Sequence, residues 1–259
     1  MQELEAGIIQ TENCGGKTCI IHLSCESIAR EAEPGQFVQV RVGNGTDPFL
    51  RRTFSIYGAD RKQGRIKLMY DIVGSGTEQL AAVKRGTCLN IIGPLGKGFD
   101  TGTGNDGDCV LVAGGIGAAP LLFLADRLKK PENKKIIFII GVRTASAHTV
   151  FEGLYGDHIS VMRATDDGSA GYHGTVSDLL KAHLDSINPS VMYVCGPHPM
   201  MKTVAAVASE AGIQCQVSLE ERMACGLGAC NGCAVRLRDG SMVRSCVDGP
   251  VFDAYEVEW

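Results

Sequence analysis

The chain has 259 residues, enough for about two domains of ordinary size. Hydrophobic residues make up 44% and charged residues 21%, which excludes disordered, coiled-coil and collagen-like chains. A net charge of −4 leaves no electrostatic footprint for nucleic acid, and no stretch has the pattern of a signal peptide or a membrane span. We therefore expect a cytoplasmic protein with neither nucleic acid nor membrane as a partner.

The first hundred residues are predicted to form a small antiparallel β-barrel. Short apolar or alternating runs, rich in β-branched residues, are separated by Gly, Pro, Asn and Asp turns, a spacing typical of such barrels. The expected strands are Leu4–Gln10, Thr18–Ser24, Gln36–Val42, Thr53–Tyr57, Arg65–Asp71 and Cys88–Ile92, with a helix over Thr77–Val83.

Residues 101–107, TGTGNDG, are the best candidate for a linker, and the pattern changes after them. Buried strands alternate with helices, which favours a doubly wound parallel sheet covered on both faces. The expected strands are Cys109–Ala113, Lys135–Gly141, Ile159–Arg163, Val191–Cys195 and Gln214–Leu219, and the expected helices are Ala118–Lys130, Thr175–Leu184 and Pro199–Ala211. We accordingly divide the chain into domains at 1–100, 101–219 and 220–259, the last being a small subdomain.

Four of the eleven cysteines are gathered in the last segment, whereas the other seven are scattered and are expected to be core residues. Their spacing is C-x4-C-x2-C-x12-C, which is typical of a plant-type [2Fe–2S] cluster held by four thiolates. A structural zinc site is the alternative, but zinc sites usually show two separated cysteine pairs. The predicted ligands are Cys225, Cys230, Cys233 and Cys246.

Two short motifs in the barrel half have both a functional and a structural interpretation. In Arg51–Ser55, the guanidinium of Arg52 could pair with a pyrophosphate and the hydroxyl of Ser55 could reach the edge of a flavin ring. The alternative is a solvated charge pair beside a strand. In Gly74–Thr77, free N–H groups before the short helix could face a phosphate, or the hydroxyl side chains could simply cap the helix.

The α/β half has glycine-rich turns where strands end. Gly114–Gly117 joins a buried strand to a helix, which suits a dinucleotide or a packing turn, although the full G-x-G-x-x-G spacing is missing. Cys195–Pro197 ends another strand, so Cys195 could face a nicotinamide or lie buried before the turn. Asp166–Gly168 indicates a turn. Arg143 could meet a 2′-phosphate or be a solvated loop residue.

Taken together, these motifs resemble the ferredoxin–NADP reductase-like flavoprotein superfamily over nearly the whole chain. Within it, the chain is most similar to the family of electron-transfer subunits of dihydroorotate dehydrogenase B. The resemblance rests on RRTFSI, VGSGT, AGGIGAAPL, ATDDGSAGYHGTV, YVCGPHPM, SLEERMACGLGACNGCAV and CVDGPVF. One departure is Thr53, where the family often has proline; since proline only fixes φ there, it leaves the expected flavin site intact.

The resemblance implies three redox groups and the residues that hold them. FAD is expected on Arg52, Thr53, Phe54, Ser55, Met69, Tyr70, Asp71, Gly76 and Thr77. NAD is expected over Gly114, Gly115, Gly117, Cys195, Gly196 and Pro197, and the [2Fe–2S] cluster on the four clustered cysteines. Ser55 and Cys195 are the expected catalytic residues, at the flavin and the nicotinamide respectively.

The resemblance also implies a partner and a reaction. In that family, a separate FMN-containing subunit oxidises dihydroorotate in pyrimidine biosynthesis, and electrons pass through the iron–sulfur cluster and FAD to NAD+. The expected assembly is a heterotetramer with two chains of each kind. One alternative is a reductase subunit that serves ferredoxin, polysulfide or another redox protein. Another is a zinc-stabilised interaction module without redox activity.

Overall fold

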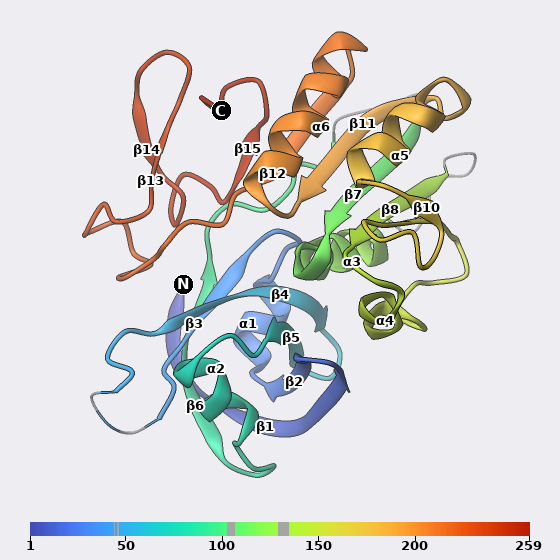
Figure 1. The fold of residues 1–259 in the computed structure, drawn as a ribbon. Helices are drawn as coiled ribbons and strands as arrows, with labels where there is room; N and C mark the ends of the chain where they lie inside the picture. Colours follow the sequence, from blue (N-terminus) through green and yellow to red (C-terminus); the bar gives the residue numbers. More distant parts are fainter. Residues whose placement is uncertain (44, 46, 103–106, 129–134) are drawn as a thin grey trace.

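The computed structural model describes residues 1–259 except 44, 46, 103–106 and 129–134. Figure 1 shows a barrel at the bottom, a layered sheet-and-helix unit at the upper right and the last segment at the upper left. The barrel closes in the order β1-β2-β5-β4-β3-β6, with antiparallel neighbours. Its strands are β1 (Gln2–Gly15), β2 (Thr18–Ser24), β3 (Phe37–Val40), β4 (Arg52–Asp60), β5 (Arg65–Asp71) and β6 (Cys88–Leu95).

The barrel core follows from the two-residue repeat of its strands, which sends alternate side chains inward. On β3, Val38 and Val40 are fully buried in the barrel core, whereas Phe37 belongs to a separate apolar cluster on the outside. Two short helices, α1 (Glu26–Glu31) and α2 (Ser75–Ala81), connect barrel strands, and Ile28 and Leu80 add their apolar side chains to the core.

The second unit is built on a sheet of seven strands in the described part of the chain, in the order β10-β9-β8-β7-β11-β12-β15. All pairs are parallel except β12 with β15, which is antiparallel. The strands are β7 (Asp108–Gly114), β8 (Ile136–Val142), β9 (Ile159–Thr165), β10 (Tyr172–His173), β11 (Pro189–Cys195), β12 (Gln214–Ser218) and β15 (Val251–Asp253).

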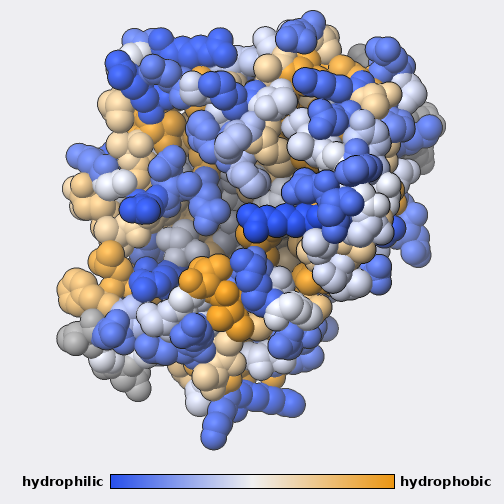
Figure 2. Space-filling model, viewed as in Figure 1, coloured by the Kyte–Doolittle hydropathy of each residue, from blue (hydrophilic) through white to orange (hydrophobic). Residues whose placement is uncertain are grey.

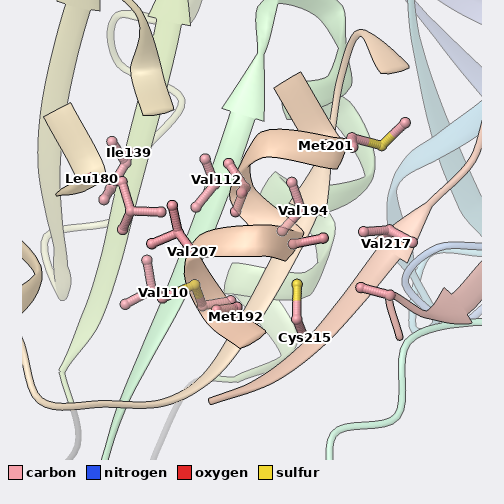
Figure 3. Close-up of a cluster of buried hydrophobic side chains, with 14 of the residues drawn as sticks. Val110, Val112, Ile139, Leu180, Met192, Val194, Met201, Val207, Cys215 and Val217 are labelled. Atoms are coloured by element: carbon pink, nitrogen blue, oxygen red, sulfur yellow. The ribbon is translucent and has the colours of Figure 1, made fainter. Parts of the chain in front are cut away.

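Helices cover both faces of this sheet because its central strands are apolar on both sides. Figure 3 shows one face, where Val110 and Val112 of β7 pack under α5 and α6 beside Leu180 and Val207. Leu111 points to the other face, which is covered by α3. The helices are α3 (Ala118–Arg127), α4 (Ala145–His148), α5 (Val176–His183) and α6 (His198–Glu210), with 3-10 turns η1 (Gly115–Gly117), η2 (Thr149–Phe151) and η3 (Leu184–Ser186).

Helix α3 joins the two units, since it touches the sheet with one side and the barrel with the other. Leu121 and Leu124 belong to the sheet core, while Phe123 inserts into the cluster of barrel residues. The turn that leads into α3 is therefore held at the boundary between barrel and sheet, beside the carboxyl ends of β7 and β11.

The last segment contacts both units. It forms the hairpin β13 (Ala234–Arg236) and β14 (Met242–Arg244), and then β15, which pairs with β12 at the edge of the sheet. The sequence shows no periodic pattern in this segment, and β15 is a strand because it pairs with β12. The segment also packs on the barrel, so it is not detached from the other two parts.

The predicted fold class is confirmed, and most element boundaries lie within three residues of the predicted ones. The sequence pattern does not indicate α1, α4, β10 or the strands of the last segment, all of which are short. The predicted linker 101–107 and the end of the helix predicted over Ala118–Lys130 fall partly outside the described residues. Within the described part of the chain, no helix is long and apolar enough to span a membrane.

Candidate functional site

A cavity of about 450 Å³ lies where the barrel meets the sheet. Strands β4 and β5 supply one wall and the turn before α3 supplies another. The predicted flavin residues that line it are Arg52, Thr53, Phe54, Ser55, Met69, Tyr70, Asp71 and Thr77. The structure therefore brings together two strands and a helix end that the sequence separates.

Gly76, the remaining predicted flavin residue, does not line the cavity but packs on a residue that does. A Cβ atom at Gly76 would lie 2.6 Å from Nε of Arg52, so this guanidinium packs directly on the glycine. Arg52 also donates a 2.7 Å hydrogen bond from Nη1 to the carbonyl oxygen of Leu50. Thr77 caps α2, because its Oγ1 accepts hydrogen bonds from the N–H groups of Val73 and Gly74. The capping interpretation thus holds for Thr77, which also faces the cavity.

Asp71 at the end of β5 connects this cavity to the β1–β2 hairpin. Its Oδ1 accepts a 2.6 Å hydrogen bond from the hydroxyl of Thr18, and its Oδ2 lies 3.1 Å from Nζ of Lys17. Tyr70 precedes it, with its ring 5.3 Å from that of Phe54, and burial raises the pKa of the Tyr70 phenol above its ordinary value. This side of the cavity is therefore aromatic and uncharged at Phe54 and Tyr70, and charged at Asp71 and Lys17.

A second and larger cavity, of about 820 Å³, adjoins the first. All of the predicted nicotinamide residues line it: Gly114, Gly115, Gly117, Cys195, Gly196 and Pro197. Arg143 and Asp166 line it as well, and both are exposed. The β1–β2 hairpin closes one side through Gly15 and Lys17, so the barrel contributes to this cavity too.

Two glycines in the turn after β7 differ in their surroundings. A Cβ at Gly117 would lie 2.6 Å from the carbonyl carbon of Cys195 and 2.8 Å from N of Gly196, so the two turns pack backbone to backbone. Gly115 has φ +53°, a conformation that glycine adopts without strain, and a Cβ there would meet nothing within 4 Å. Close packing and open space for a ligand thus occur in the same turn.

Cys195 lies in the wall that the two cavities share. It is 9% exposed, and burial, with Glu220 as the second cause, raises the pKa of its thiol to about 12. The thiol is therefore neutral near pH 7 and adds a small polarisable surface to both cavities. Glu220 and Glu221, at the start of the last segment, line both cavities as well.

The four predicted metal ligands are arranged as two pairs. Cys230 contributes to the lowered pKa of Cys225, and Cys233 contributes to the raised pKa of Cys246, so the two thiols of each pair lie close to each other. Among the described residues, no group of three or more His, Cys, Asp or Glu side chains is arranged to hold one metal ion. Four cysteine ligands suit both a [2Fe–2S] cluster and a tetrahedral zinc, so it is the C-x4-C-x2-C-x12-C spacing that favours the cluster.

The surroundings of these thiols also suit sulfur ligands. The N–H of Leu227 lies 3.4 Å from Sγ of Cys225, and this interaction is the main reason why the pKa of that thiol is lowered to about 6. Gly232 and Cys246 direct their N–H groups at Sγ of Cys230 and Cys233, at 3.4 and 3.5 Å. Backbone donors aimed at thiolates stabilise the anionic form that binds metal.

One buried hydroxyl belongs to the residue that precedes Cys246 in the chain. Ser245, which lies between Arg244 and Cys246 in the sequence, is fully buried. Its N–H donates a 2.9 Å hydrogen bond to the carbonyl of Cys233. Its Oγ has no hydrogen-bond partner among the described residues. The backbone N–H groups that face the sulfurs of Cys225, Cys230 and Cys233 are the observation on which the residues present fit a [2Fe–2S] group.

Several residues that shape the cavities had no sequence signal. Phe37 on β3 lines the first cavity and packs in an apolar cluster with Cys233 and Cys246. Met223 also lines the first cavity and packs against the same apolar cluster, so the metal-ligand segment reaches the first cavity directly. Lys17 borders both cavities from a hairpin that has the composition of an ordinary turn. Each of these comes from a part of the chain distant from the motifs.

Comparisons with known proteins agree with this geometry. Residues 220–258 match the family model for the iron-sulfur cluster binding domain of dihydroorotate dehydrogenase B, and residues 111–206 match that for an oxidoreductase NAD-binding domain. The dihydroorotate dehydrogenase B (NAD(+)) electron transfer subunit of Desulforamulus reducens is 40% identical over 258 residues, which is 98% of this chain and 98% of that protein. The chain belongs to the family of dihydroorotate dehydrogenase B electron transfer subunits.

Other relatives support this assignment. The corresponding subunit of Caldanaerobacter subterraneus subsp. tengcongensis is 37% identical and covers 92% of both chains. Among solved structures, an NADH-dependent reduced ferredoxin-NADP oxidoreductase, studied for flavin-based electron bifurcation, has a TM-score of 0.87 and 30% identity. The match covers 98% of this chain and 90% of that one.

Membership in the dihydroorotate dehydrogenase B electron transfer family confirms the resemblance found in the sequence. The chain is an oxidoreductase subunit of the electron-transfer type, with an NAD-binding domain and an iron–sulfur cluster binding domain. The zinc-module alternative is not supported, because residues 220–258 match an iron–sulfur domain. The assignment of individual residues to each cofactor stays a prediction.

Proposed function

We propose that this chain takes electrons from an FMN-containing dihydroorotate dehydrogenase subunit through a [2Fe–2S] cluster and FAD, and delivers them to NAD+ in pyrimidine biosynthesis. The observation that carries the proposal is the contact between the three sites. The two cavities share walls at Cys195 and Glu220, and the cysteine-bearing segment packs on the barrel beside the first cavity through Phe37 and Met223.

The first cavity suits FAD. Arg52 provides a guanidinium for the pyrophosphate, Phe54 and Tyr70 provide apolar surface, and Ser55 provides a hydroxyl at the lining. When bound, a flavin exchanges either single electrons or a hydride, which is the chemistry needed between an iron–sulfur cluster and a nicotinamide. Gly76 supports this site indirectly, because it leaves the space that the Arg52 side chain occupies.

The second cavity suits the nicotinamide dinucleotide. The turn after β7, with open space at Gly115, faces it at the carboxyl ends of parallel strands, where ligands of such sheets bind. Cys195 in the shared wall stays protonated, so it presents no charge to the reacting ring. The residues at this wall orient the ring and exclude water, and hydride transfer requires no general base from the chain.

Exposed apolar side chains near the metal-ligand segment support a partner on this side. Leu227, two residues after Cys225, is 45% exposed, and Val247, next to Cys246, is 37% exposed. Figure 2 shows orange hydrophobic side chains scattered among hydrophilic ones on the face drawn there. A partner subunit seated near the cluster would bury them and shorten the distance that electrons must travel.

Anaerobic co-expression with the FMN-containing chain encoded by the same organism tests the proposal. We expect a complex with two chains of each kind by native mass spectrometry, flavin and iron–sulfur absorbance, acid-labile sulfide and dihydroorotate:NAD+ activity. The chain alone should reduce ferricyanide with NADH but should not oxidise dihydroorotate. Dihydroorotate oxidation by the isolated chain would refute the proposed division of labour.

A role as reductase subunit for ferredoxin is the second candidate, favoured by the similarity to the NADH-dependent ferredoxin-NADP oxidoreductase. The same preparation distinguishes the two. Ferredoxin reduction by NADH, in a complex that lacks dihydroorotate activity, would replace the first proposal with the second.

A further inference from the structure

Strand β3 lies between the flavin wall and the metal-ligand segment. It pairs with β4 on one side, in the register Gln39↔Thr53, so it is the direct neighbour of the predicted flavin strand. Its alternate residues Phe37 and Gln39 lie on the face opposite to the barrel core. Phe37 packs with Cys233 and Cys246, and Gln39 is completely buried beneath the same segment.

The carboxamide of Gln39 contacts the metal-ligand loop. A Cβ atom at Gly226, the residue after Cys225, would lie 2.5 Å from Nε2 and 2.6 Å from Cδ of Gln39. Gly226 has φ +69°, so the loop turns at this point, and glycine is required both by the turn and by the contact. The amide plane thus packs directly against the backbone that carries the first predicted cluster ligand.

The hydrogen bonding of this amide is incomplete. Nε2 donates to Oγ1 of Thr53 across 3.4 Å, and Oε1 has no partner among the described residues. Burying an amide without its hydrogen-bond partners costs free energy, so such a group usually has a functional role or a bound partner. Rotating the carboxamide by half a turn would let Thr53 donate to its oxygen and turn its NH2 group away from Thr53, available to another acceptor.

We propose that Gln39 is a positioning residue that holds the cysteine loop against the flavin strand and tunes the reduction potential of the cluster. Amide donors and burial around the ligand sulfurs are among the factors that set the potential of iron–sulfur centres. Gln39 supplies burial beside the loop through its contact with Gly226, and its link to Thr53 couples the loop to the strand that carries Arg52 and Ser55. The inference rests on the proposed function, because it requires a cluster and a flavin.

Redox titration of the purified full-length chain, followed by EPR of the reduced cluster, tests this role. Gln39→Met keeps the length of the side chain and removes its hydrogen bonds; Gln39→Glu adds negative charge beside the loop. In Gln39→Glu we expect the ratio of reduced to oxidised cluster at fixed potential to fall about tenfold, which is about 59 mV for one electron. Gln39→Met should change the potential and the g-values, while the FAD content and the ferricyanide activity stay near wild type.

Gln63→Glu is the matched control, since Gln63 is exposed on the turn between β4 and β5. A double-mutant cycle adds the second test: Thr53→Val should shift the cluster signal in the wild-type background and leave it unchanged in Gln39→Met. If Gln39 variants cannot be loaded with iron, Thr53→Val alone decides, and an unshifted potential overturns the inference. Loaded Gln39 variants with the potential and EPR signal of Gln63→Glu overturn it as well. Absence of acid-labile sulfide from the wild-type chain would instead overturn the proposed function.

Discussion

Replacing Gly117 by alanine should weaken nicotinamide binding because it forces two backbone turns apart. The new Cβ would lie 2.6 Å from the carbonyl carbon of Cys195 and 2.8 Å from N of Gly196, and closer still to the Cys195 carbonyl oxygen. Ordinary contacts begin at about 3.4 Å, so relieving the three contacts fully would require the turns to separate by about 0.6–1.0 Å. Because the neighbours are backbone atoms, no rotamer change can relieve the overlap.

Overpacking of this kind costs about 1–3 kcal/mol. Both turns line the second cavity. If this free energy is lost from NADH binding there, the Michaelis constant for NADH should rise about 5- to 150-fold. The assay is NADH:ferricyanide reduction over a range of NADH concentrations, with FAD content measured on the same preparation. We expect FAD to be retained, since the predicted flavin residues that line the first cavity all belong to the barrel half of the chain.

The matched control is Gly58→Ala in β4, where a Cβ would meet only the Lys67 side chain at 3.8 Å. This variant should match wild type in both the Michaelis constant and the melting temperature. The reasoning is refuted if Gly117→Ala behaves like Gly58→Ala, because the two turns would then tolerate separation without loss of the ligand site.

Three further predictions concern the cluster, the coenzyme and the core. Cys225→Ala should abolish the iron–sulfur EPR signal and acid-labile sulfide but retain FAD and ferricyanide activity; a full cluster signal in this variant would contradict the ligand assignment. Asp166→Ser should raise the NADPH-to-NADH ratio of kcat/KM about tenfold, because it removes a carboxylate from the cavity wall that also carries exposed Arg143; steady-state kinetics with both coenzymes measure this ratio. Burial raises the pKa of the Cys215 thiol from 9.0 to about 12, so above pH 9 the unfolded state ionises while the folded state does not, and stability falls as pH rises. Between pH 9 and pH 10, the free energy of unfolding measured with urea should fall by about 1 kcal/mol more in the wild type than in Cys215→Ala.

The sequence predicts the strands best where local pattern and tertiary environment agree. Thr18–Ser24 and Arg65–Asp71 have the predicted bounds, because β-branched and apolar residues fill these strands and turn residues flank them. Val251–Asp253 is different, since three residues carry no periodic signal and become a strand only by pairing with β12. The short helix Glu26–Glu31 has the same limitation, because its two buried residues are too few to show a helical repeat.

The candidate site was predictable where a motif carries its own chemistry. The cysteine spacing indicates a cluster without any knowledge of the fold, and the glycine turns mark the strand ends at the sheet edge. The connections between the sites were not predictable. Phe37, Gln39 and Met223 belong to segments with ordinary composition, and they become neighbours of the cysteines only when the last segment packs on the barrel.

The pairing of β15 with β12 has a consequence for how the molecule could be shortened. Val251–Asp253 occupies the outer edge of β12, so a protein that stopped before β15 would leave the N–H and C=O groups of that edge unpaired. Bare edges of this type recruit strands from other molecules. The final nine residues, from Val251 on, therefore protect the protein against self-association, and a shortened chain should precipitate rather than persist as a smaller flavoprotein.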